Sequence, residues 1–121
     1  MLKAAINAQE LEVLIKQNDL VLVDFWADWC APCKQFATVY ERMAQQNPDL
    51  VFAKIDVAQE TELAQAFHIR SIPHLMIFKQ GIVIYSDSGS LPESSLAELI
   101  KQAIAADVKS IREAIDKDDG S

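Results

Sequence analysis

Hydrophobic residues follow two patterns along this chain. Residues 20–25 form a run that is apolar except for Asp24, which is typical of a strand buried on both faces of a sheet. From Phe36 to Met43 apolar residues recur at helical spacing, which predicts an amphipathic helix that stops at Asn47-Pro48 because proline cannot continue it. The remaining pattern predicts a helix opened by Asn7 and Glu10, strands at 50–56, 75–79 and 82–86, a helix around 60–67 and a long C-terminal helix.

The order of these elements predicts an α/β fold. Strands alternate with helices along most of the chain, and a Gln-Gly turn at residues 80–81 then joins the last two strands in a hairpin. Ser90 and Glu93 have the spacing of a capping box at the start of the C-terminal helix. We therefore expect a central mixed β-sheet flanked by helices on both faces.

The two cysteines of the chain lie between a predicted strand and the start of the helix that follows it. Cys30 and Cys33 are three residues apart, so on the first helical turn their sulfurs face the same way and can form a disulfide. Unpaired N–H groups and the helix dipole favour a thiolate at Cys30, and only a thiolate attacks a disulfide. Pro32 fits the first turn, where its missing N–H is not needed. The spacing indicates a redox site in which Cys33 is the more shielded thiol and acts second.

Two stretches carry a family resemblance. FWADWCAPCK closely resembles the active-site signature of the thioredoxin family, and SIPHLMIFKQG resembles the family's segment around a cis-proline. The resemblance covers residues 7–105 and implies a thioredoxin fold and a thiol-disulfide oxidoreductase that reduces protein disulfides. It implies that Cys30 attacks the substrate, that Cys33 completes the exchange, and that the Cys30–Cys33 disulfide is the redox group, with no cofactor. It suggests a flavin-containing thioredoxin reductase as the electron donor.

Asp24 is a carboxylate within an apolar strand. Burial disfavours its charged form and should raise its pKa towards neutrality, which suits a group that exchanges protons there. The resemblance assigns it the role of proton acceptor for Cys33, directly or through water, with Lys54 in the next strand as electrostatic partner. The alternative is an ion pair that merely tolerates burial.

The family resemblance also implies a substrate surface around the cysteines. A cis bond between Ile72 and Pro73 would let the Ile72 main chain pair with an extended substrate, in the manner of strand addition. Trp29 resembles the family's exposed aromatic residue beside the nucleophile, and Pro32 lies between the cysteines. We expect these four residues to contact the substrate.

His74 departs from the family pattern, which usually has threonine after the proline. An imidazole here titrates near neutrality and can bias the Cys30 thiolate, or it is a satisfied polar residue without a redox role. Both hypotheses stay open at this stage, and we include His74 among the expected substrate contacts. Ala31 replaces the family's usual glycine, and the Ala-Pro pair is closer to reducing thioredoxins than to oxidases.

Composition narrows the functional classes. The chain has 121 residues and a formal net charge of -7, which argues against nucleic-acid binding. No apolar run approaches the length of a membrane span, and Glu10 and Glu12 lie where a secretory signal would need an apolar core. Two cysteines in one motif, without an export signal, favour a reducing cytoplasm.

The C-terminus exceeds a minimal thioredoxin. We assign residues 1–106 to a thioredoxin-like domain and 107–121 to a helical extension and disordered tail. Apolar residues including Val108, Ile111 and Ile115 continue the helical stripe, so a helix over 91–115 would be on the order of 37 Å long. Its last turns fray, fold back or pack on another chain, and we favour a partner or homodimer.

The sequence allows two alternatives to a redox enzyme, a zinc site and an adaptor. Cys30, Cys33, His68 and His74 supply four potential zinc ligands, but the 34 residues between the pairs far exceed the roughly 12–15 of a finger-like site. The second alternative is a redox-linked or chaperone-like adaptor that works through the fold and the C-terminal helix. Retention of both cysteines, Asp24 and Lys54 favours catalysis.

Overall fold

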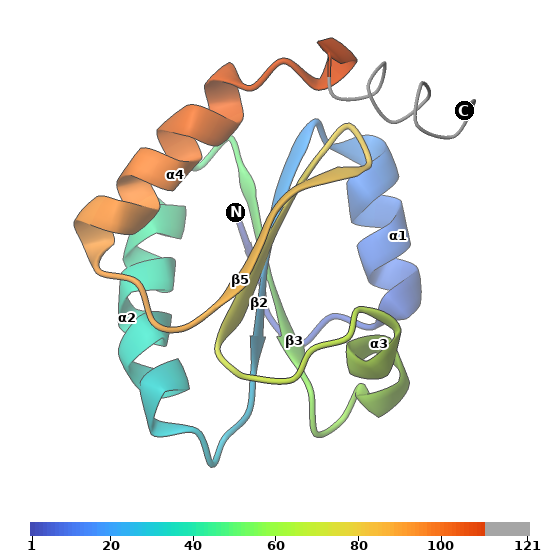
Figure 1. Ribbon diagram of the computed structural model, residues 1–121, viewed down its shortest axis with the longest axis vertical. Helices are drawn as coiled ribbons and strands as arrows, with labels where there is room; N and C mark the ends of the chain where they lie inside the picture. The colour runs from blue at the N-terminus through green and yellow to red at the C-terminus, as the bar shows by residue number, and fades with distance from the viewer. Residues whose placement is uncertain (111–121) are drawn as a thin grey trace.

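The computed structural model describes residues 1–110. Its elements confirm the predicted order of strands and helices from the first helix onward and add a short strand before it (Figure 1); apart from the C-terminal helix, the predicted boundaries shift by one or two residues. They are β1 (Leu2–Lys3), α1 (Ala8–Gln17), β2 (Leu20–Trp26), α2 (Ala31–Gln46), β3 (Val51–Asp56), α3 (Thr61–Ala66), β4 (His74–Lys79), β5 (Ile82–Ser88) and α4 (Glu93–Ala105).

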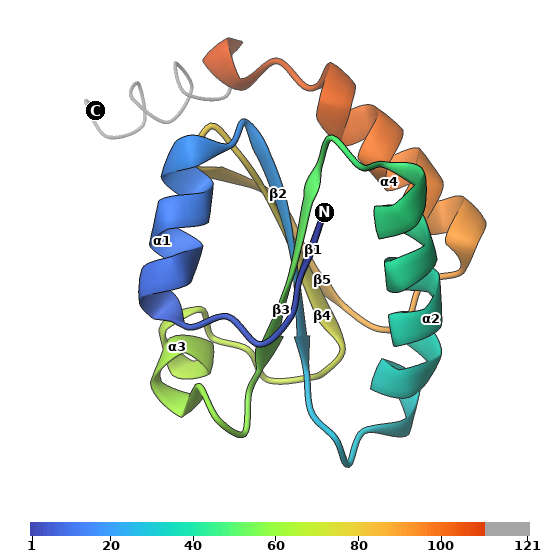
Figure 2. The same ribbon diagram turned by 180° about the vertical axis from the view of Figure 1, so that it is seen from behind.

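Across the described residues, the five strands form one mixed sheet in the order β1-β3-β2-β4-β5. Strands β1, β3 and β2 are parallel, whereas β4 runs antiparallel to β2 and β5 antiparallel to β4. Helices α2 and α4 cover one face, and α1 and α3 cover the other (Figures 1 and 2). The predicted mixed sheet with helices on both faces is therefore confirmed.

Alternation along β2 divides the core between the two faces of the sheet. Leu20 and Leu22 pack under α2 and α4 with Phe36 and Tyr40, whereas Val21 and Val23 belong to the cluster under α1 and α3. Successive side chains of a strand point to opposite faces, so Asp24 points to the same face as Leu20 and Leu22, the face under α2 and α4. The sequence therefore places a carboxyl group among the apolar side chains beneath the active-site helix.

A local capping signal predicts the start of α1 correctly but not the start of α4. Asn7 caps α1, where its side chain accepts from the N–H of Glu10 at 2.9 Å and the Glu10 carboxylate accepts from the N–H of Asn7 at 3.1 Å. Helix α4 differs from the expectation. It starts after Pro92 without a side-chain cap, so the predicted Ser90–Glu93 capping box is wrong. The Glu93 carboxylate instead pairs with Arg42 of α2 at 3.3 Å.

The C-terminal helix is present but shorter than its apolar stripe predicts. Helix α4 ends at Ala105, and Ala106 adopts an extended conformation, so one continuous helix over 91–115 is wrong. Lys79 of β4 explains the break, because its ammonium group donates to the carbonyl oxygens of Ala103, Ile104 and Ala106 at 2.7–2.9 Å. These carbonyls lie at the helix end, where no further turn satisfies them.

The residues after the break bear on the predicted partner surface. Val108 is only 4% exposed within this chain, so it needs no second chain for its burial. The predictions for Ile111, Ile115 and the tail lie outside the described residues.

Candidate active site at the start of helix α2

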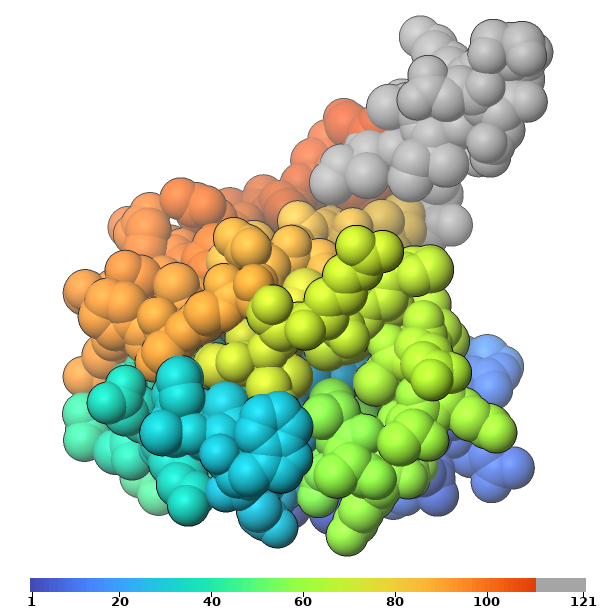
Figure 3. Space-filling model, turned by 60° about the horizontal axis from the view of Figure 1, so that its bottom comes forward, coloured from blue at the N-terminus to red at the C-terminus, as the bar shows by residue number. Residues whose placement is uncertain are grey.

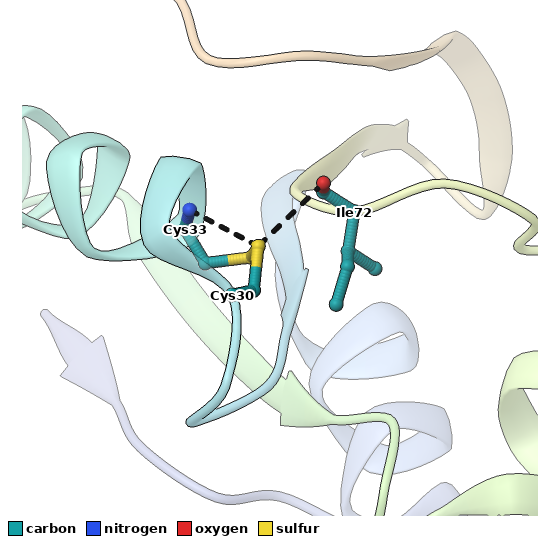
Figure 4. Close-up of a disulfide and its surroundings, with 3 residues drawn as sticks. All are labelled: Cys30, Cys33 and Ile72. Atoms are coloured by element: carbon teal, nitrogen blue, oxygen red, sulfur yellow. Dashed lines mark hydrogen bonds between the residues drawn. A yellow bond between two sulfur atoms is a disulfide. The ribbon is translucent and has the colours of Figure 1, made fainter.

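The two cysteines are joined by a disulfide at the first turn of α2 (Figure 4). Cys30 is the N-cap of the helix, and its sulfur accepts from the N–H of Cys33 at 3.2 Å. The Cα atoms are 5.3 Å apart, within the range that a disulfide spans. The backbone donor that contacts Cys30 Sγ would also stabilise a thiolate there, and the positive end of the helix dipole acts in the same direction.

The segment before β4 lies against the nucleophile. The Ile72–Pro73 peptide bond is cis, as the family resemblance implied. The carbonyl oxygen of Ile72 is 3.7 Å from Cys30 Sγ, a contact that can become a hydrogen bond when the thiol carries a proton (Figure 4). The N–H of Gly89 donates to the carbonyl of Pro73 at 2.8 Å and ties the segment to the end of β5. Cys30 therefore sits beside backbone that an extended peptide can reach.

This end of the molecule presents a sharp contrast in exposure. Trp29 is 75% exposed, whereas both cysteines are buried, with Cys33 marginally the deeper of the two. Pro32 is exposed on the first turn of α2. Figure 3 shows the segment after β2 (cyan) meeting the segment before β4 (yellow-green) on this surface. The expected substrate contacts Trp29, Pro32, Ile72 and Pro73 are thus carried by the two segments that meet at the disulfide.

Asp24 lies in β2, in the interior of the protein. Its residue is 0% exposed, and among residues 1–110 neither carboxyl oxygen has a hydrogen-bond partner. Burial raises the pKa of Asp24 to about 7, and the positive charge of Lys54 opposes that rise. The chain therefore holds a carboxyl group that can exchange a proton near neutral pH.

Lys54 is placed differently from the simple pairing that the resemblance suggests. It is the cross-strand neighbour of Asp24 in the β2–β3 register, as expected. Its ammonium nitrogen, however, lies 3.9 Å from a carboxylate oxygen of Glu41 and 5.0 Å from the centre of the Trp26 ring. Lys54 acts on Asp24 through its charge rather than through a direct hydrogen bond.

His74 is engaged on the side of the sheet that faces α1 and α3. Its Nε2 lies 2.8 Å from the Ser86 hydroxyl oxygen, and its ring meets Phe25 edge-on. Burial lowers the pKa of His74, and the charge of Asp87 opposes that change. The contacts of this imidazole thus favour the satisfied polar residue over a group that biases Cys30.

Two residues of α2 contact the strand next to Asp24 and were not singled out from the sequence. Tyr40 is fully buried and donates its hydroxyl proton to the carbonyl of Ala53 at 2.8 Å. Glu41 holds the Lys54 ammonium group, as described above. The sequence does contain a signal for Tyr40. It follows Cys33 by seven residues, which places both on the same face of the helix.

The zinc alternative finds no support in the arrangement of side chains. Over residues 1–110, no group of three or more His, Cys, Asp or Glu side chains is placed to hold a metal ion. The sulfurs of Cys30 and Cys33 are bonded to each other, and His68 is an exposed residue after α3.

Comparison with known proteins decides the family. The thioredoxin family model matches residues 3–102. The chain belongs to the thioredoxin family. A protein of Streptomyces coelicolor named as a thioredoxin 2 is 46% identical over 110 residues, which cover 91% of this chain and 82% of that protein. The thioredoxin of Mycoplasmoides gallisepticum is 39% identical over 83% of this chain and its own entire length.

Solved structures agree with the sequence relatives. A mutant thioredoxin from Halobacterium salinarum superposes with a TM-score of 0.79 at 36% identity, over 84% of this chain and 89% of that one. The thioredoxin from Fasciola hepatica gives a TM-score of 0.77 at 35% identity, over 84% and 98% of the two chains. The thioredoxin fold predicted from sequence is confirmed.

The family and the disulfide-capable pair together establish the general activity. The protein is a thiol-disulfide oxidoreductase, and the intact Cys30–Cys33 pair favours this function over an adaptor. Its family acts on protein disulfides and is served by reductases. Within the described part of the chain, no helix has the length and apolar character needed to cross a membrane.

Proposed function

We propose that this thioredoxin-family protein reduces protein disulfides through a Cys30-first exchange. The Cys30 thiolate attacks one sulfur of a substrate disulfide, the substrate S–S bond breaks, and a mixed disulfide forms while one substrate thiolate leaves. The Cys33 thiolate then attacks Cys30 Sγ, which forms the Cys30–Cys33 disulfide and releases the second substrate thiolate. Two electrons pass from the cysteine pair to the substrate.

The observation that carries this assignment is the position of Cys30 Sγ. It accepts from a backbone N–H at the start of α2, and it lies 3.7 Å from the Ile72 carbonyl at the surface where Trp29 is exposed. The first feature supports ionisation of the thiol, and the second supports approach by an extended chain that pairs with Ile72.

The roles of the remaining residues follow from their places around the pair. Asp24 accepts the proton of Cys33, directly or through water, and the charge of Lys54 makes that carboxyl easier to ionise. Trp29, Pro32 and Pro73 form the substrate surface. His74 shapes that surface as a neutral group. The exchange needs no cofactor beyond the cysteine pair, and a flavin-containing thioredoxin reductase returns it to the dithiol.

Single cysteine variants test this order of events. In an insulin-reduction assay with dithiothreitol, both Cys30→Ser and Cys33→Ser should fall to the uncatalysed rate. When the reduced variants are freed of dithiothreitol and then mixed with insulin, Cys33→Ser should also accumulate a covalent mixed disulfide, because its nucleophile is intact and its resolving thiol is absent. Accumulation by Cys30→Ser instead would reverse the assignment.

Two narrower expectations belong to the same proposal. We propose a reducing, cytoplasmic setting, supported by the placement of both cysteines in one redox motif. We also propose self-association or partner binding through the C-terminal residues, supported by the apolar stripe of the sequence and by Ile104, which is an exposed large apolar residue of α4. Sedimentation of the full chain against a chain ending at Ala106 tests the second, and two identical monomers would contradict it.

A further inference from the structure

The ammonium group of Lys54 lies between a buried carboxyl and an exposed one. Asp24 is its neighbour across the β2–β3 register, and Glu41 approaches from α2. The Lys54 side chain is 12% exposed and that of Glu41 is 51% exposed. Lys54 therefore extends from the sheet towards the rim of the helix, with its charge 3.9 Å from the Glu41 oxygen.

Asp24 has few other groups that can assist its ionisation. In the described residues its oxygens have no hydrogen-bond partner, and the nearby Tyr40 hydroxyl donates to the Ala53 carbonyl instead. Its cross-strand neighbour on β4 is Leu75, which carries no charge. Lys54 on β3 and Tyr40 on α2 interact electrostatically with Asp24, and α2 also carries Glu41 and the cysteine pair. After burial, the charge of Lys54 is thus the main influence on the pKa of Asp24.

We propose that Glu41 is a positioning residue that holds the Lys54 ammonium group at the rim of α2 and so sets how strongly its charge acts on Asp24. This rests on the proposed role of Asp24 and adds a residue that tunes it. Trp26 completes the arrangement, because its ring lies 5.0 Å from the ammonium nitrogen and provides a favourable face for the cation at that position.

Removing the Glu41 charge acts on Asp24 in one direction by two routes. The Lys54 ammonium group becomes free to move towards Asp24, and a negative charge on the neighbouring helix α2 is lost. Both changes favour the ionised form of Asp24. Glu41 is half exposed, so solvent screens its interaction and the expected shift is a fraction of a pH unit.

A carboxyl titration followed by NMR tests the proposal on the oxidised full-length protein. Glu41→Gln should lower the pKa of Asp24 by about 0.5 unit. Glu98→Gln is the matched control, since it removes the same charge from an exposed position on α4 and should leave that pKa unchanged. In a Lys54→Met background the effect of Glu41→Gln should fall to less than half, because the route through Lys54 is gone.

Three results would overturn the proposal: an unchanged Asp24 pKa in Glu41→Gln, a raised one, or an equal shift in the Lys54→Met background. The pH profile of insulin reduction separates this from the proposed function. If Asp24 is the proton acceptor, the profile of Glu41→Gln should shift to lower pH by the same amount as the titration. A shift of the titration alone would support the role of Glu41 and contradict that of Asp24.

Discussion

Two ionisable side chains, Lys79 and Asp24, are buried under the same pair of helices, and they differ in their hydrogen bonding. Lys79 stands near one end of the α2–α4 face, where three backbone carbonyls at the end of α4 accept from its ammonium group. Asp24 stands near the other end, beneath the start of α2, and within residues 1–110 no group donates to its oxygens. The Lys79 ammonium group thus has three hydrogen-bond acceptors, whereas the Asp24 carboxyl interacts with the charge of Lys54 without a hydrogen bond.

The difference separates a structural use of a buried charge from a chemical one. A buried charge that satisfies orphan carbonyls fixes geometry, and here it sets where α4 ends. A buried charge without partners is destabilised, so its proton affinity rises and the group can gain or lose a proton near neutral pH. Substitutions at the two positions should therefore have opposite effects on stability.

The largest effect is expected for Lys79→Met. The variant keeps the length of the side chain but removes the ammonium donor from the carbonyls of Ala103, Ile104 and Ala106, so the free energy of unfolding should fall by about 3 kcal/mol. Urea denaturation measures this. Lys101→Met removes an exposed lysine of α4 and should change stability by less than about 0.5 kcal/mol. Equal stability of the two variants would contradict the structural role of Lys79 at the end of α4.

Asp24→Ala should move stability the other way. Above about pH 8 the variant should be more stable than the wild type by about 2 kcal/mol, because an isolated buried carboxylate is lost and a small cavity offsets only part of the gain. Insulin reduction should become slower, since Cys33 loses its proton acceptor. A destabilised variant or faster turnover would contradict the role assigned to this carboxyl.

The pH dependence of stability offers a second measurement on Asp24. Its pKa is about 7 in the folded protein against an ordinary 3.8, so between these values the folded state holds a proton that the unfolded state has released. The wild type should therefore lose stability relative to Asp24→Ala as pH rises from about 4 to about 7. Its free energy of unfolding minus that of the variant should fall by up to about 4 kcal/mol in total. A difference that is flat over this range would show that the folded-state pKa is not raised.

The sequence predicted the parts of the site that depend on local pattern. The helix start at Cys30, the buried place of Asp24 and its strand neighbour Lys54 all follow from periodicity and motif. The cis bond before Pro73 came from the family resemblance, since an isolated Ile-Pro pair favours the trans form.

The parts that sequence could not give depend on contacts between distant elements. The apolar stripe beyond Ala105 continues at helical spacing, so nothing local shows that Lys79 of β4 ends the helix there. Glu93 has the spacing of a capping partner but is drawn to Arg42 on a different helix. The family resemblance pairs Lys54 with Asp24 from the next strand, whereas its ammonium group lies 3.9 Å from the carboxylate of Glu41 on α2.

The smallest effect is expected for a substitution at His74, which contacts neither Asp24 nor Lys79. Its imidazole meets Ser86 and Phe25, and its pKa is lowered, so it is neutral near pH 7 and exerts no charge on Cys30. His74→Thr should therefore shift the pKa of the Cys30 thiol in the reduced protein by less than about 0.2 unit. The pH dependence of alkylation by iodoacetamide measures that pKa, with Ser86→Ala as a control that removes the imidazole's partner but keeps the ring. A shift of about one unit in His74→Thr would instead make the imidazole a third group that tunes the redox pair.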